Sequence, residues 1–188
     1  MTTKKVFDIP IIARGKIIAP GDDAIEFGGR VGARFRCPNP NNYINELLLS
    51  NGSALEDLYN TPTGEILDFL AALGPRLGLD NPYMKEAFDL CVEAGELPES
   101  ILVPVYSVAQ DLFDREKLAL QVDAQIGIDY LDGWVEQGHP GKSQTRIRAI
   151  GTRQVHVIAG NVPITAALTV IRTALSKSDS LIKLPSND

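Results

Sequence analysis

Short runs of apolar residues, separated by turn signals, open the chain and favour β-strands. Residues 6–18 are rich in β-branched side chains, and the Arg14-Gly15 pair marks a turn within them. Residues 24–36 contain two more such runs around a pair of glycines, a pattern that predicts a hairpin. Residues 37–42 are rich in Pro and Asn and predict a loop. We therefore expect residues 1–42 to form a β-rich N-terminal segment.

Apolar residues then recur every three or four positions, which is the period of a helix. The pairs Thr61-Pro62 and Asn81-Pro82 each combine a capping residue with a proline that suits the first helical position. The apolar stripes that follow them are Ile66, Leu70, Leu73 and Leu77, and Ala87, Leu90, Cys91 and Ala94. Two further helices are expected over residues 101–113 and 115–134. Residues 43–138 are therefore predicted to be a helical region.

The pattern changes again after a polar linker at residues 138–143. Residues 154–159 and 180–184 are apolar runs of strand length, and residues 146–150 alternate in polarity. A helix is predicted to start at Gly160-Asn161-Val162-Pro163 and to turn inward Ala167, Val170, Ile171, Ala174 and Leu175. Residues 144–188 thus predict one β–α–β unit with parallel strands. Two strands cannot bury both faces of a doubly wound sheet, so we expect this α/β unit to be an incomplete part of a larger sheet.

Composition and charge narrow the class of protein. The chain has 188 residues, of which 44% are hydrophobic and 22% charged, and this excludes a disordered or collagen-like chain. Residues 1–138 carry 11 basic and 22 acidic side chains, whereas residues 139–188 carry 7 basic and 2 acidic ones. The acidic part argues against nucleic acid as the main partner. The basic part suits either a phosphorylated cofactor or an ordinary solvated surface. No apolar run reaches the about 18–20 residues of a membrane span. We expect a cytoplasmic protein, since only two cysteines and no secretory signal are present.

The residues alone offer one candidate for catalysis. Ligands of α/β sheets bind beyond the carboxyl ends of the strands, and Asn161 stands there, after the first strand of the unit. Its side-chain amide can donate to a developing oxyanion, beside the unpaired N–H groups of a helix start. The alternative is that Asn161 only caps the helix, and without other information the residues favour this simpler interpretation.

Neither cysteine has the surroundings of a convincing nucleophile. Cys37 follows two arginines that would lower its pKa, but no histidine motif accompanies it. Cys91 lies on an apolar helical stripe and is expected in the core. His139 and His156 have no cysteine or carboxylate at ligand spacing, so no metal site is expected. His156, inside a strand, is interpreted as a satisfied buried side chain.

Several stretches carry a family resemblance, mainly residues 156–163, residues 166–168 with Lys177-Ser178, and residues 181–188. They resemble the opening of the cofactor domain of the luminescence-type long-chain fatty acyl-CoA reductases, which belong to the aldehyde dehydrogenase superfamily. That superfamily has an Asn-aromatic-Pro turn, a helix, and a strand that ends in Lys-Pro-Ser-Glu. With residues 65–70, 81–83 and 131–134, the resemblance covers roughly residues 55–188. It implies an aldehyde dehydrogenase-like α/β fold, in which residues 144–188 are an incomplete three-layer α/β/α cofactor domain preceded by the mostly helical region and the β-rich segment.

The resemblance also implies a reaction and a set of site residues. In the family a cysteine thiolate attacks a fatty acyl thioester, and a reduced nicotinamide converts the acyl-enzyme to an aldehyde. Asn161 matches the asparagine that stabilises the oxyanion. The cofactor-binding positions that it implies are Ile158, Ala159, Gly160, Lys183 and Ser186. The cysteine is expected beyond residue 188, so the chain alone should be inactive.

Two departures from the superfamily pattern bear on the cofactor. Leu184 separates Lys183 from the following Pro-Ser, so the match of Lys183 to the ribose-binding lysine is uncertain by one residue. Asn187 replaces the usual glutamate, which would repel a 2′-phosphate, and the resemblance therefore permits NADP. Asp188 is adjacent and weakens this argument.

The resemblance implies partners and leaves alternatives open. The expected substrate is a fatty acyl-CoA or an acyl-protein, the expected partner is a fatty-acid-activating synthetase, and the full-length protein is expected to be a homo-oligomer. One alternative is another aldehyde dehydrogenase relative, which oxidises aldehydes or acts on an acyl phosphate. The other is a truncated, non-catalytic subunit with a role in assembly or regulation.

Overall fold

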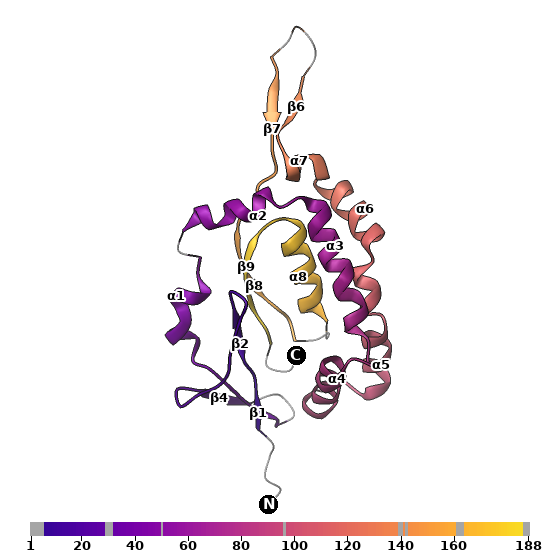
Figure 1. The fold of residues 1–188 in the computed structure, drawn as a ribbon. Coiled ribbons are helices and arrows are strands. Elements are labelled where there is room, and N and C mark those ends of the chain that lie inside the picture. Colours follow the sequence, from indigo (N-terminus) through magenta and orange to yellow (C-terminus); the bar gives the residue numbers. More distant parts are fainter. Residues whose placement is uncertain are drawn as a thin grey trace, which may run out of the picture.

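The computed structural model describes residues 6–28, 32–49, 51–95, 97–138, 141, 143–160 and 164–185. It has a mixed α/β architecture (Figure 1). The C-terminal β–α–β unit lies at its centre, with helices along one side and the N-terminal strands below. A thin hairpin projects from the opposite end. The proposed division at residues 42 and 138–143 stays a prediction.

The N-terminal strands are β1 (Val6–Asp8), β2 (Ile11–Ala13), β3 (Lys16–Ile18), β4 (Ile25–Gly28) and β5 (Arg34–Cys37). The predicted hairpin of β4 and β5 is confirmed, and β2 pairs antiparallel with β3. The β2–β3 turn has φ of 50° at Arg14 and 77° at Gly15, as a tight hairpin turn requires. The parallel pairing of β1 with β5 was not predicted. Phe35 stacks between Phe7 and Phe27, with ring centroids 5.8 and 5.5 Å away.

Short helices make up the next part of the chain: η1 (Pro40–Tyr43), α1 (Ile44–Leu47), η2 (Gly52–Leu55), α2 (Glu56–Asn60), α3 (Thr63–Leu73), η3 (Gly74–Leu77), α4 (Pro82–Ala94), α5 (Glu99–Ser107), η4 (Gln110–Phe113), α6 (Arg115–Gln125) and α7 (Ile128–Asp132). Asn81 caps α4 as predicted, because its side chain accepts from the Tyr83 amide at 3.0 Å. The prediction at Thr61 is wrong: α3 begins after Pro62, and the Thr61 hydroxyl donates to the Asp57 carbonyl instead.

The helices and the β–α–β unit share one apolar core. Its buried members are Ile66, Leu67, Leu70, Phe113, Leu118, Val122, Leu131, Ile171 and Leu175. The helix predicted over residues 115–134 is divided, because Gly127 has φ of 92° and separates α6 from α7. Ile126, between the two helices, is 38% exposed.

The predicted β–α–β unit is confirmed by β8 (Arg153–Val157), α8 (Thr165–Leu175) and β9 (Asp179–Lys183). The strands are parallel, with Val155 opposite Leu181. Ile171 and Leu175 are buried as predicted, but Val170 is 44% exposed, against the prediction. The strand expected over residues 146–150 is β7 (Thr145–Ile147), which pairs with β6 (Val135–Gln137) to form the projecting hairpin. Among the described residues, no helix has the length and apolar character to cross a membrane.

Candidate functional site

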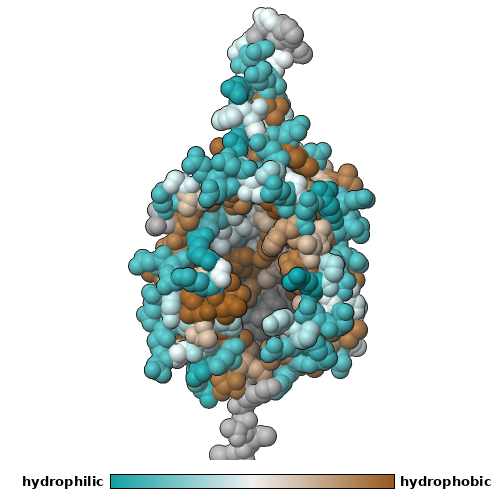
Figure 2. Space-filling view, in the orientation of Figure 1, coloured by the Kyte–Doolittle hydropathy of each residue, from teal (hydrophilic) through white to brown (hydrophobic). Residues whose placement is uncertain are grey.

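The carboxyl ends of β8 and β9 lie side by side. Val157 is opposite Lys183 in the register, and the Ile158 amide donates to the Lys183 carbonyl at 3.0 Å. Ile158 is buried, Ala159 is exposed, and the Lys183 side chain faces solvent. Figure 2 shows that the molecule is hollowed at its centre, over the region that β8, β9 and α8 occupy in Figure 1. The structure therefore brings together the two loop starts on which the predicted cofactor positions lie.

Helix α8 begins near this edge of the sheet, and the side chain of its N-cap residue makes no capping hydrogen bond. Its N-cap is Ile164, whose φ of 72° is left-handed and whose side chain has no acceptor for the first amides. The amides of Ala167 and Leu168 bond to the Ile164 carbonyl. A helix N-terminus carries partial positive charge and favours anions such as phosphate.

Not every predicted site residue falls within the described part of the chain. Asn161 and Ser186 lie outside the described residues, so the proposed oxyanion donor and one cofactor position stay predictions. The roles of Ile158, Ala159 and Lys183 also stay predictions, although the structure gives their places. Gly160 is half-buried directly after Ala159.

A buried ion pair stands at the opposite, amino end of β9. Lys177 is 1% exposed, and its ammonium donates to Asp132 Oδ1 at 2.7 Å and to the Leu131 carbonyl at 3.1 Å. Asp132 also accepts from the amide and the hydroxyl of Thr63, at 2.9 and 2.6 Å. Burial raises the pKa of Asp132, but hydrogen bonds from Lys177 and Thr63 outweigh it, and the net pKa is lowered. We call Lys177, Asp132 and Thr63 the lysine cluster.

Further contacts near the lysine cluster hold the start of both parallel strands. A Cβ atom on Gly151 would lie 2.1 Å from the Lys177 carbonyl, so only glycine fits before β8. The Tyr59 hydroxyl donates to the Gly151 carbonyl at 2.8 Å. Arg14, at the tip of the β2–β3 hairpin, holds both carboxylate oxygens of Asp179 at 2.5 and 3.2 Å. These contacts join residues that are distant in the chain, so no local pattern predicts this end of the unit, and only the family resemblance includes Lys177-Ser178.

Polar side chains also fill the space between the sheet and α8. His156 Nε2 lies 3.3 Å from the Ser180 hydroxyl oxygen, which lies 3.0 Å from that of Thr173. Gln154 donates to the Ser178 hydroxyl at 3.1 Å. His156 therefore has a hydrogen-bond partner between the sheet and the helix, as expected for a structural side chain.

The cysteines do not form a nucleophilic site. Burial raises the pKa of Cys37, so the expectation that nearby arginines lower it is wrong. The reason is that Arg34 pairs with Glu26 and Arg36 pairs with Asp8 at 2.9 Å. The structure also shows Cys91 Sγ 3.0 Å from the Tyr106 hydroxyl, in a cluster between α4 and α5. Within the described ranges, no group of three potential metal ligands occurs.

Comparison with known proteins decides the family. The sequence model of the acyl-CoA reductase (LuxC) family matches residues 58–188. The chain belongs to this family. It is 23% identical over 184 residues to the long-chain acyl-protein thioester reductase of Vibrio harveyi, covering 96% of this chain and 36% of that protein. The reductase of the same name from Photobacterium phosphoreum is 26% identical over 133 residues, covering 69% of this chain and 26% of that protein.

A solved structure supports the fold of this LuxC family member. The structure of 3,6-anhydro-L-galactose dehydrogenase in complex with NAP superposes with a TM-score of 0.67 at 12% identity. The match covers 97% of this chain and 37% of the dehydrogenase. It confirms the expected aldehyde dehydrogenase-like fold. This chain therefore spans about a third of the length of the proteins that it matches.

Proposed function

We propose that this chain forms the N-terminal part of a reductase that converts a long-chain fatty acyl thioester to an aldehyde with NADPH. Membership of the acyl-CoA reductase family and the names of the curated relatives support the reaction class. The observation that carries the proposal is the hydrogen bond between the Ile158 amide and the Lys183 carbonyl. This hydrogen bond joins the carboxyl ends of β8 and β9, beside the start of α8. In α/β sheets, nucleotides bind beyond the carboxyl ends of the strands.

The described residues fit a dinucleotide at this edge. Ala159 is small and exposed, which leaves room for close approach, and the start of α8 favours a phosphate. Lys183 presents an exposed cation at the carboxyl end of β9, where it would bind the adenosine ribose or its 2′-phosphate. The excess of basic residues in the 139–188 part supports NADPH over NADH. When bound, NADPH supplies the hydride of the proposed reaction.

The chain's own chemical contribution would be at Asn161. A cysteine beyond residue 188 attacks the thioester carbonyl, the carbonyl oxygen becomes negative, and the thiol departs when the carbonyl re-forms on the cysteine. The Asn161 side-chain amide would donate to that oxygen and lower the barrier of the acyl transfer. A single donor of this kind accounts for about 10²–10³-fold in rate in other enzymes.

The test is an assay of NADPH oxidation that depends on a long-chain acyl-CoA or acyl-protein. We expect no activity from the 188-residue chain and clear activity from a longer protein encoded in the same reading frame. In that longer protein, Asn161→Ala should lower kcat about 10²-fold while NADPH binding is retained. Activity of the 188-residue chain by itself would contradict the proposal. Aldehyde oxidation or acyl phosphate reduction by the longer protein, without thioester reduction, would favour another aldehyde dehydrogenase relative.

The biological setting is also proposed from the family. We infer a cytoplasmic homo-oligomer that accepts acyl groups from a fatty-acid-activating synthetase. Co-purification of a synthetase with the longer protein would test the partner. A stop codon directly after Asp188 would instead favour a non-catalytic subunit.

A further inference from the structure

The residue before helix α8 has an unusual backbone conformation. Three non-glycine residues in the described ranges have positive φ, namely Arg14, Ile164 and Lys177. Arg14 and Lys177 each take part in an ion pair, with Asp179 and Asp132 respectively. Ile164 has φ of 72° and ψ of −5°, and it is the β-branched member of the three. A β-branched residue rarely adopts this conformation, which persists only where the surrounding structure holds it.

The side chain of Ile164 packs against a small apolar cluster between helices α4 and α5. The buried members of this cluster are Phe88, Leu102 and Tyr106, which we call the α4–α5 cluster. The Phe88 and Tyr106 rings meet edge to face, with centroids 5.3 Å apart. Among the described residues of this packing, Ile164 alone comes from outside residues 79–106. It therefore joins helices α4 and α5 to the start of α8.

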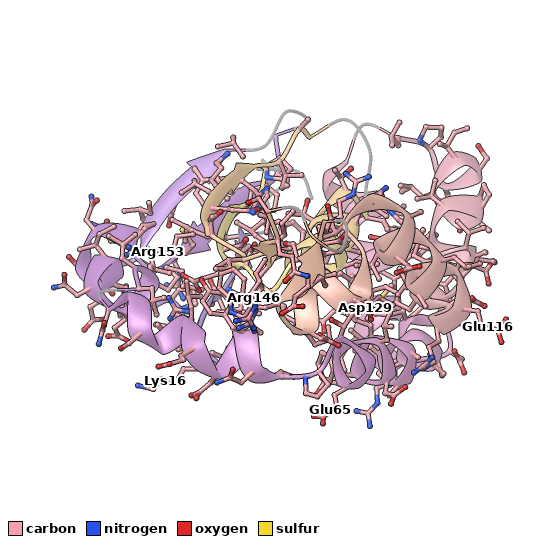
Figure 3. The ribbon with its side chains drawn as sticks, turned by 90° about the horizontal axis from the view of Figure 1, so that it is seen from above. Lys16, Glu65, Glu116, Asp129, Arg146 and Arg153 are labelled. Carbon is pink, nitrogen blue, oxygen red and sulfur yellow. The ribbon has the colours of Figure 1, made fainter. Side chains whose placement is uncertain are left out.

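Helix α8 lies between two sides of the molecule. In Figure 1, β8 and β9 lie on one side of it, whereas α3, α4 and α5 lie on the other. Figure 3 shows the arrangement from above, with Lys16 and Arg153 on the strand side, Glu116 on the helical side, and α8 between them. Ile164 thus connects the cofactor edge with helices from the helical side.

The two halves of α8 are anchored in different apolar clusters. Ile171 and Leu175, in the second half, belong to the main core. In the first turn, the Ile164 carbonyl accepts from the Ala167 and Leu168 amides at 2.9 and 3.4 Å. The position of this first turn therefore depends on the backbone of Ile164.

We propose that Ile164 is a positioning residue for NADPH. Its packing on the α4–α5 cluster holds the left-handed backbone, and this backbone fixes the first turn of α8 at the cofactor edge. A change in the conformation of Ile164 would move the helix start that favours a phosphate. The proposal rests on the proposed function, because NADPH is the cofactor of that reaction. It adds that helices α4 and α5 set the affinity for this cofactor from a distance.

The strain at Ile164 is tested by the stability of two variants of the 188-residue chain. Ile164→Ala and Ile164→Gly both remove the packing, but only glycine adopts φ of 72° without steric cost. Asn81 is the matched control, because it is the N-cap of α4 and has an ordinary φ of −77°. The ratio of the unfolding equilibrium constants of the alanine and glycine variants should be at least about fivefold larger at Ile164 than at Asn81. Equal ratios at the two positions would overturn the proposal.

Coupling between the α4–α5 cluster and α8 is tested by amide hydrogen exchange in the same chain. Leu102→Ala should accelerate exchange of the Ala167 and Leu168 amides about tenfold, because it loosens the packing of Ile164. Leu55→Ala is the matched control, since Leu55 is also buried but is not a member of the cluster. The control should change the two rates less than about twofold. Circular dichroism establishes that each variant is folded, and Leu102→Val replaces Leu102→Ala if the latter is not. Equal rates in the Leu102 and Leu55 variants would overturn the proposal.

Affinity for NADPH separates positioning from stability in the longer protein. Ile164→Gly and Ile164→Ala should each raise the Kd about tenfold, although the glycine variant is the more stable of the two. Ile164→Val keeps a branched apolar side chain and should raise the Kd less than about twofold. An unchanged Kd in the glycine and alanine variants, or a Kd that simply follows their stability, would overturn the proposal.

Failure of the proposed cofactor would give a different result. A longer protein that binds no NADPH before any substitution would show that the cofactor is wrong. The two tests on the 188-residue chain need no NADPH, so they decide separately whether the α4–α5 cluster fixes the start of α8.

Discussion

The two ends of the β8–β9 pair are built in opposite ways. At the amino end, Lys177 is buried and paired with Asp132, and the backbone of Gly151 is in close contact with the α8–β9 turn. At the carboxyl end, Ala159 and Lys183 are exposed, and the hydrogen bond between Ile158 and Lys183 closes the strand pair. This difference indicates that contacts fix the two strands at their amino end, whereas their carboxyl end stays accessible to a ligand.

The largest effect is expected from a comparison of Lys177, before the start of β9, with Lys183, its last residue. Lys177→Met removes a buried cation, takes the Lys177 donor from the Leu131 carbonyl and leaves the Asp132 carboxylate with only its hydrogen bonds from Thr63. We expect the free energy of unfolding to fall by about 2–4 kcal/mol, below the full cost of a buried pair because Asp132 is partly exposed. Lys183→Met, at the exposed end, should change it by less than about 0.5 kcal/mol. Urea denaturation followed by circular dichroism measures both.

Equal losses in the two lysine variants would show that the strand pair is not fixed from its amino end. In the longer protein, Lys183→Met should raise the Kd for NADPH but leave the free energy of unfolding nearly unchanged.

The next effect concerns the close approach of Gly151. Gly151→Ala would place a Cβ atom 2.1 Å from the Lys177 carbonyl and 2.4 Å from that of Ser176, both backbone atoms that cannot rotate away. We expect a loss of about 2 kcal/mol in the free energy of unfolding. Gly64→Ala is the control, since nothing lies within 4 Å of its added Cβ and helix α3 favours alanine by about 0.5–1 kcal/mol. A Gly151→Ala variant as stable as the Gly64→Ala variant would refute the close packing.

A smaller effect is expected from pH. The pKa of Asp132 is lowered below its ordinary value of 3.8, so the native state favours the charged carboxylate. Its contribution to stability is therefore fully present well above pH 3.8 and is lost as pH falls through that value and the lowered native pKa. Asp132→Asn should be less stable than the original chain at pH 7, and the gap should narrow below about pH 4. Urea denaturation at several pH values tests this, and a gap independent of pH would contradict it.

The sequence predicted the elements that depend on neighbouring residues. Asn81 followed by proline marked the start of α4, and the two apolar runs marked β8 and β9, because caps and strand periods are local signals. It did not predict the lysine cluster, since Lys177 and Asp132 are 45 residues apart, and Asp132 and Thr63 are 69 apart. A charged residue after a helix is usually solvated, so only the folded chain shows that this lysine is buried.

The candidate site divides in the same way. The adjacent strand ends follow from the parallel β–α–β pattern, which was predicted from periodicity alone. The sequence predicted neither the break at Gly127 nor the exposure of Val170. The spacing of apolar residues does not indicate where φ is positive, nor which apolar side chains the rest of the fold covers. The functional roles of Asn161 and Lys183 rest on the family and not on any local pattern.

The smallest effect is expected on the open face of β8. Val155 and Val157 are 68% and 74% exposed, although parallel strands are normally covered on both faces. Val157→Thr keeps the branched shape and adds a hydroxyl, so in the 188-residue chain it should change the free energy of unfolding by less than about 0.5 kcal/mol. In a longer protein that covers this face, the same change would bury the hydroxyl and cost about 1–3 kcal/mol. An equal, small effect in both proteins would show that this face of β8 stays in water in the longer protein as well.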